Sequence, residues 1–105
     1  MNVRMLPAAE EDAREAGDGL NLNRDGWGAA FAAEIGRAVA AITANPQLYP
    51  RTEDGPDFPE NREYFIARFE YRVVYAIWKG EAVIVAVTHA RRRSGAWRDR
   101  LNELD

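Results

Sequence analysis

The sequence predicts an α+β domain in which a helical hairpin packs on a curved antiparallel sheet of three to four strands. Two alanine-rich segments with helically spaced apolar residues occupy the first half. Three short runs rich in β-branched and aromatic residues occupy the second half. Short connections make neighbouring strands antiparallel, so the predicted order is an N-terminal strand, two helices and three strands, with or without a short C-terminal helix.

Length and composition indicate one globular domain over residues 1–105. Apolar residues make up 47% of the chain and charged residues 30%, a balance typical of a folded domain. There is no cysteine and only one histidine, which excludes disulfides, thiolate metal sites and a His-rich metal site. No apolar run reaches membrane-spanning length and no secretory leader is evident. We therefore expect a cytoplasmic protein that uses no metal or cofactor and no membrane.

The N-terminal elements follow from local signals. NVRML at residues 2–6 alternates polar and apolar side chains, as a short strand does. Pro7 suits the first turn of a helix, which the acids that follow also favour. We expect this helix to end around Gly17–Gly19, with LNLNRDG as a connector or a frayed extension.

A second helix and a long loop come next. Asp25 suits the N-cap position, and apolar residues recur at helical spacing from Trp27 to Ile42. Asn45-Pro46 ends the helix, because proline cannot continue it. The loop over residues 49–61 holds three prolines and four acidic residues, and its length suggests a role in recognition.

The remaining residues are predicted to form β-structure. The expected strands are Arg62–Ala67, Tyr71–Trp78 and Ala82–His89. Lys79-Gly80 is a tight reversal between the last two. The C-terminal AWRDRLNEL has the length of one or two helical turns.

Charge is distributed unevenly along the chain. Residues 1–61 carry five Lys and Arg against eleven Asp and Glu, whereas residues 62–105 carry nine against six. The two halves are therefore −6 and +3, which gives the net charge of −3. A basic C-terminal half can engage an anionic partner locally even in an acidic protein.

Basic and aromatic residues of the C-terminal half form the main candidate site. Arginine matches phosphate and carboxylate geometry, tryptophan can stack on a ligand, and histidine can exchange a proton near neutral pH. Arg68 and Arg72 are an even number of residues apart and share a face if the turn between them keeps the register. The full set is Arg68, Arg72, His89, Arg91, Arg92, Arg93, Trp97, Arg98 and Arg100.

Structural explanations for the same residues stay open. Arginines that follow a buried strand often form a solvated edge that deters aggregation. His89 can serve as a structural hydrogen-bonding group, and Trp97 can cap the core. Tyr71 and Tyr75 have the strand parity of core residues. A catalytic triad that pairs Ser94 with His89 is disfavoured, because no orienting partner for Ser94 is evident.

Several stretches together resemble the RelE/ParE superfamily, the toxin half of type II toxin–antitoxin modules. REYFIARFEYRVVYAI and VIVAVTHARRRSGAW resemble its β-hairpin and C-terminal signature. MLPAAEEDAREA and FAAEIGRAVAAITANPQLYP resemble its first strand, its helical hairpin and its Asn-Pro exit. The resemblance covers nearly the whole chain in the right order.

The resemblance implies one of two activities. ParE-like toxins bind DNA gyrase and stall it on cleaved DNA without catalytic chemistry of their own, and RelE-like toxins are metal-independent endoribonucleases that cut mRNA on the ribosome. The pattern of His89, Arg91, Arg92 and Trp97 looks closer to the ParE branch. In the RelE branch, Arg72 and Arg93 match residues that carry cleavage, with His89 beside them. The target-binding set implied for the ParE branch is Arg68, Arg91, Arg92, Arg93 and Trp97.

Physical arguments favour the gyrase-directed alternative. Affinity for RNA comes largely from phosphate neutralisation, and an acidic chain whose only lysine is Lys79 supplies this poorly. Binding to a protein depends more on local complementarity. In either branch we expect a cognate antitoxin and a hetero-oligomer with it. An inactive relative kept as a binding protein is the third alternative.

Overall fold

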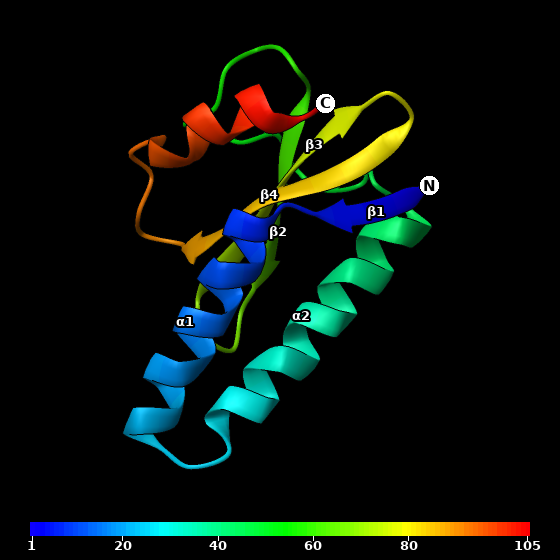
Figure 1. Cartoon of the computed structure of the whole chain (residues 1–105). Coiled ribbons are helices and arrows are strands. Elements are labelled where there is room, and N and C mark those ends of the chain that lie inside the picture. The colour runs from blue at the N-terminus through cyan, green and yellow to red at the C-terminus, as the bar shows by residue number, and fades with distance from the viewer.

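The computed structural model describes all 105 residues and contains four strands, two α-helices and a C-terminal 3-10 helix (Figure 1). None of the helices combines the length and the apolar composition that a membrane crossing requires. The elements are β1 (Asn2–Met5), α1 (Pro7–Asn23), α2 (Trp27–Ala44), β2 (Asn61–Ile66), β3 (Tyr71–Trp78), β4 (Glu81–His89) and η1 (Ala96–Glu103).

The strands form one sheet in the order β1-β4-β3-β2, which confirms the predicted α+β architecture. Neighbours from β2 to β4 are antiparallel, as their short connections require. The strand β1 instead runs parallel to the first half of β4, from Asn2 opposite Glu81 to Met5 opposite Ile84. A register shift between Val74 and Tyr75 of β3 bulges the sheet and contributes to its curvature.

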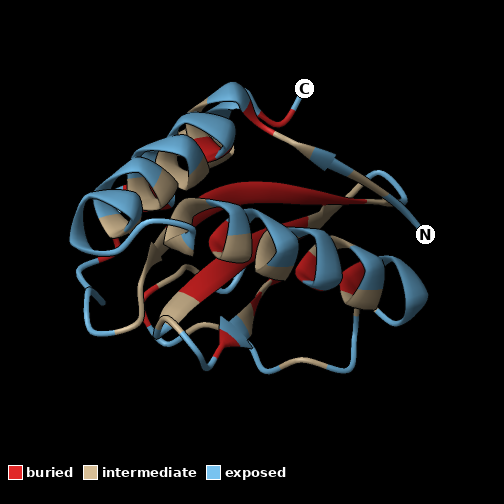
Figure 2. Cartoon of the chain, turned by 90° about the horizontal axis from the view of Figure 1, so that it is seen from below, coloured by how far each residue is buried: buried red, intermediate tan, exposed pale blue.

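Each face of the sheet has its own core (Figure 2). On one face the helical hairpin packs on the strands, with Phe31 of α2 and Tyr75 of β3 completely buried. On the other face Trp97 and Leu104 cover strand residues such as Val74. The hairpin was predicted from helical periodicity. The packing of the C-terminal segment on the other face was not predicted, because one or two helical turns are too short to show a clear apolar face.

The helix α1 extends to Asn23, beyond the end expected at Gly17–Gly19. Gly17 lies against Gly28 of α2, where a Cβ on Gly28 would come within 3.1 Å of the Gly17 carbonyl oxygen. Glycine here allows two helices to approach closely and does not end the first one. The connector of the hairpin is correspondingly shorter than LNLNRDG.

Asp25 does not cap α2, contrary to the prediction. The N-cap is Gly26, which has a φ of 90° and no side-chain capping bond of its own. The Oδ1 of Asn21, from the last turn of α1, accepts the backbone N–H groups of Gly26 at 3.0 Å and Gly28 at 3.3 Å. A side chain from the preceding helix therefore satisfies the donors that an N-cap residue normally satisfies.

The long acidic loop between α2 and β2 is confirmed and has no strand apart from a bridge between Arg51 and Arg62. Its middle, at Asp54 and Gly55, lies against Trp97 of η1 rather than in solvent. Asp54 is only 7% exposed there, although its neighbours Glu53 and Asp57 are exposed. The loop therefore contributes a buried carboxylate to the second face of the sheet, next to the candidate site.

Candidate functional site

The centre of the site is a buried ion pair between Asp54 and Arg72. Arg72 lies on β3 and is 0% exposed. Its Nη1 and Nη2 donate to the two carboxylate oxygens of Asp54 at 2.8 and 2.6 Å. Asp54 also accepts the backbone N–H of Gly95 and the indole Nε1–H of Trp97, each at 3.1 Å. One loop carboxylate thus joins β3 to the C-terminal segment.

The environment of Asp54 keeps it ionised. Burial alone would raise its pKa, but hydrogen bonds from Arg72 and Trp97 and the charge of Arg72 outweigh burial and lower the pKa to about 2. Arg72 retains one unmet donor, because its Nε has no hydrogen-bond partner. The pair is therefore a charged, nearly enclosed junction rather than a surface salt bridge.

A second carboxylate, Glu63 of β2, holds the next part of the C-terminal segment. Its Oε1 accepts from Arg72 at 3.2 Å and from Arg93 at 2.9 Å, and its Oε2 accepts from Arg93 at 3.1 Å. The hydrogen bond to Glu63 raises the pKa of Arg93. The Nη2 of Arg72 also donates to the Arg92 carbonyl at 2.7 Å. The backbone of residues 92–95 is therefore fixed over Arg72.

Trp97, predicted as a stacking or target-binding residue, is part of the core. It is 5% exposed, packs with the second cluster and donates its indole N–H to Asp54. Of the two alternatives for this residue, the structure places it in the core-capping position.

Three of the predicted arginines are free of polar partners. The side chains of Arg68, Arg91 and Arg92 are exposed and form no hydrogen bond or salt bridge, although that of Arg68 lies 5.1 Å from the centre of the Phe69 ring. The other candidates are engaged: Arg93 with Glu63, Arg98 with the Asp54 carbonyl and Arg100 with Asp12.

Arg68 and Arg72 do not share a face as the parity argument suggested. Arg68 lies in the turn between β2 and β3, where Glu70 has a positive φ of 57°, so the strand alternation does not extend through it. The turn instead meets the segment after β4, because the Ala90 N–H donates to the Glu70 carbonyl at 2.7 Å. Arg68 and Arg91 therefore lie at the same end of the sheet, which we call the basic end, with Arg92 and Arg93.

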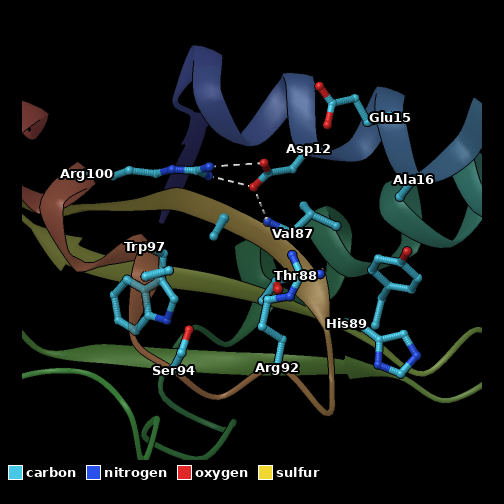
Figure 3. A pocket seen from close by; sticks show the side chains of 13 residues that line it. Asp12, Glu15, Ala16, Val87, Thr88, His89, Arg92, Ser94, Trp97 and Arg100 are labelled. Carbon is cyan, nitrogen blue, oxygen red and sulfur yellow. Dashed lines mark hydrogen bonds and ion pairs between the residues drawn. The ribbon is translucent and has the colours of Figure 1, made fainter.

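A cleft of about 300 Å³ runs beside the second half of β4, between α1 and the C-terminal segment (Figure 3). Asp12 and Arg100 form a two-bond ion pair on one rim, at 2.6 and 3.1 Å. His89 and Arg92 lie along the other. The Nδ1 of His89 accepts the Arg91 N–H at 3.2 Å, and its ring packs edge-on against Tyr71. The cleft thus brings His89 and Arg92 together.

Sequence reasoning missed three residues of this region, Asp54, Glu63 and Phe65. The two carboxylates entered only the counts of acidic residues, although an acid that alternates with core residues along a strand, as Glu63 does, is a recognisable sign of a buried partner. Phe65 is 52% exposed on β2 and was assigned to a strand without any role. No local signal marks Asp54.

The fold and the site define a small α+β binding domain with an exposed basic end fixed by buried carboxylates. The sequence matches the family model described as the ParE toxin of the type II toxin–antitoxin system parDE over residues 3–94. This match spans most of the chain, so the chain belongs to the ParE toxin family, as the resemblance suggested.

One solved structure gives the fold an independent counterpart. It is described as the chromosomal ParDE TA system from P. aeruginosa, and its matching chain superposes with a TM-score of 0.72. The match covers 87% of this chain and 97% of that chain at 12% sequence identity, a level at which the likeness shows the shared fold alone. A search of curated proteins finds no significant sequence match.

Proposed function

We propose that this toxin acts by binding DNA gyrase through the basic end of its sheet. The observation that carries the proposal is that some arginines of this region are buried and paired whereas others are exposed and unpaired. Arg72 is enclosed and neutralised by two carboxylates, whereas Arg91 and Arg92 are exposed and unpaired on a segment fixed at several points. A rigid display of free guanidinium groups suits electrostatic recognition of a protein surface.

The same geometry weighs against the nuclease alternative. Cleavage in the RelE-like manner would need Arg72 and Arg93 to reach a scissile phosphate. Arg72 is 0% exposed, and Arg93 is held by both oxygens of Glu63. Lys79, the only lysine, pairs with Asp105 at the far end of the β3–β4 hairpin. Neither a free catalytic arginine nor a lysine-rich surface is therefore presented to RNA.

An antitoxin is the second partner that we propose. Membership of a type II toxin family supports a cognate protein that neutralises this one in a hetero-oligomer. The outer groove of the helical hairpin, where Gly17 meets Gly28, is the surface on which a disordered tail can fold.

The test of the target is a supercoiling assay with purified gyrase and relaxed plasmid, in parallel with cell-free translation. We expect the wild-type protein to block supercoiling and accumulate cleaved DNA while mRNA stays intact. The double variant Arg91→Ala/Arg92→Ala is expected to lose this inhibition. Arg37→Ala removes one arginine on α2 whose side chain is 68% exposed, and serves as the control for loss of an exposed positive charge away from the basic end.

Cells give an independent readout of the same question. After induction without antitoxin, precursor incorporation is expected to show DNA synthesis falling before translation. If translation falls first and the wild-type protein cleaves mRNA, the nuclease alternative is correct. If neither process is affected by the wild-type chain, the inactive-relative alternative takes its place.

A further inference from the structure

Phe65 is an exposed aromatic residue that no core contact explains. It is 52% exposed on β2, on the same face of the sheet as Asn61 and Glu63, both of which are buried. The acidic loop and the C-terminal segment cover this face over Glu63 and Arg72, and the cover stops before Phe65. The side chain is thus left at the uncovered end of an otherwise covered sheet face.

The position of Phe65 places it beside the segment that carries the C-terminal arginines. It is two residues along β2 from Glu63, whose carboxylate holds Arg93, so Phe65 and Arg93 are neighbours on one face. On the neighbouring strand β3, Phe65 is paired with Arg72, whose Nη2 donates to the carbonyl of Arg92. An exposed apolar ring therefore lies near the side chain of Arg93 and the backbone of Arg92 at the basic end.

We propose that Phe65 is the apolar anchor of the surface that binds the toxin's target, with Arg91 and Arg92 as its charged rim. The inference rests on the proposed function and deepens it. The fitting occupant is a protein surface that offers an apolar pocket bordered by carboxylates. Interfaces commonly combine a central aromatic residue with charged groups around it, and the aromatic residue then carries much of the binding energy.

Charge argues for a protein over a nucleic acid as this occupant. Only three arginines at this end are unpaired, whereas the acidic loop that covers part of the same face contributes exposed Glu53 and buried Asp54. A phosphate backbone would meet these acids, whereas a folded partner can match a small basic patch locally.

The test compares Phe65→Ala with Phe58→Ala. Phe58 is 76% exposed and packs against Trp78 at the opposite end of β3, so its removal is a matched control for loss of an exposed ring. We expect Phe65→Ala to weaken binding to gyrase about tenfold and to relieve growth arrest, with unchanged thermal unfolding and antitoxin binding. Phe58→Ala is expected to behave as wild type.

The outcomes separate this inference from the proposed function. If wild type and Phe65→Ala inhibit gyrase equally, the anchor is refuted and the gyrase target stands. If gyrase does not bind the wild type but Phe65→Ala still abolishes growth arrest, the anchor stands and the target is another protein. If Phe65→Ala weakens only antitoxin binding, or only binding to a single-stranded RNA, the surface belongs to that partner and the inference is wrong.

Discussion

At the scale of single residues, the most consequential one is Asp54. It accepts donors from β3, from the backbone of Gly95 and from Trp97, while its carbonyl accepts from Arg98. A buried ion pair by itself is weak evidence of stability, because desolvation offsets the attraction. Removing one partner is different, since Arg72 already has an unmet Nε and would be left with a poorly compensated charge.

We expect Asp54→Asn to lower the free energy of unfolding by about 3 kcal/mol at neutral pH. The pKa of Asp54 is about 2 in the folded protein and ordinarily 3.8, so its contribution is complete above the ordinary value and is lost as pH falls toward 2. The difference between wild type and variant should therefore narrow between about pH 4 and pH 2.

Urea unfolding across this pH range is the measurement. Asp57→Asn is the control, because Asp57 is exposed in the same loop and forms no salt bridge. A wild-type-to-variant difference that stays constant down to pH 2 would show that the charge of Asp54 is not what stabilises the junction.

At the scale of elements, the C-terminal segment depends on a glycine at its bend. Gly95 has a φ of 72°, and a Cβ there would come within 2.8 Å of the Asp54 carbonyl oxygen. We expect Gly95→Ala to destabilise the fold by about 3 kcal/mol, since it adds a clash to an unfavourable backbone conformation. Gly80→Ala, at a φ of 78° with open space around it, should cost only about 1 kcal/mol. Thermal unfolding of the two variants tests the difference; equal losses would rule out the clash.

The open edge of β4 gives a second prediction at this scale. The strand β1 pairs only as far as Ile84, and beyond it Asp12 accepts the Val87 N–H at 3.0 Å while Arg100 donates to the Val85 carbonyl at 2.9 Å. This ion pair occupies the positions of a missing strand. We expect Asp12→Ala to speed amide exchange at Val87 about tenfold, because a hydrogen bond to a charged acceptor is lost.

Hydrogen exchange followed by NMR can read the Val87 amide directly. Glu11→Ala removes a neighbouring exposed acid that pairs with Arg14 on the outer side of α1, and should leave Val87 unchanged. If both variants speed exchange alike, general loosening of α1 is responsible and not the loss of this bond.

How far the sequence predicts the molecule also depends on scale. Periodicity places the strands and the Lys79-Gly80 reversal to within a residue or so, because β-branched runs and turn residues are local signals. The predicted end of α1 and the predicted N-cap of α2 were wrong, because the first depends on the approach of Gly17 to Gly28 and the second on Asn21. The junction at Asp54 was missed for the same reason, since its partner Arg72 is 18 residues away.

At the scale of the whole molecule, the fold converts an uneven sequence charge into an uneven surface. Half of the arginines of the basic half pair with acids, and three of them pair with acids of the acidic half: Arg62 with Glu60, Arg72 with Asp54 and Arg100 with Asp12. What stays unpaired is concentrated at the basic end. The net charge of −3 therefore understates the local positive field that a target would meet.

This arrangement predicts a local salt dependence of target binding. Screening shortens the reach of exposed charges to about 10 Å at 0.1 M salt. We expect association of the wild type with gyrase, the proposed target, to slow as salt rises from about 0.05 to 0.3 M, with a clearly flatter dependence for Arg91→Ala/Arg92→Ala. Surface plasmon resonance with immobilised gyrase measures the association rate constant of the wild type and of the double variant. Arg37→Ala, which changes the net charge far from the basic end, should keep the wild-type slope. If it flattens the slope as much, net charge governs association and the unpaired arginines have no special part in it.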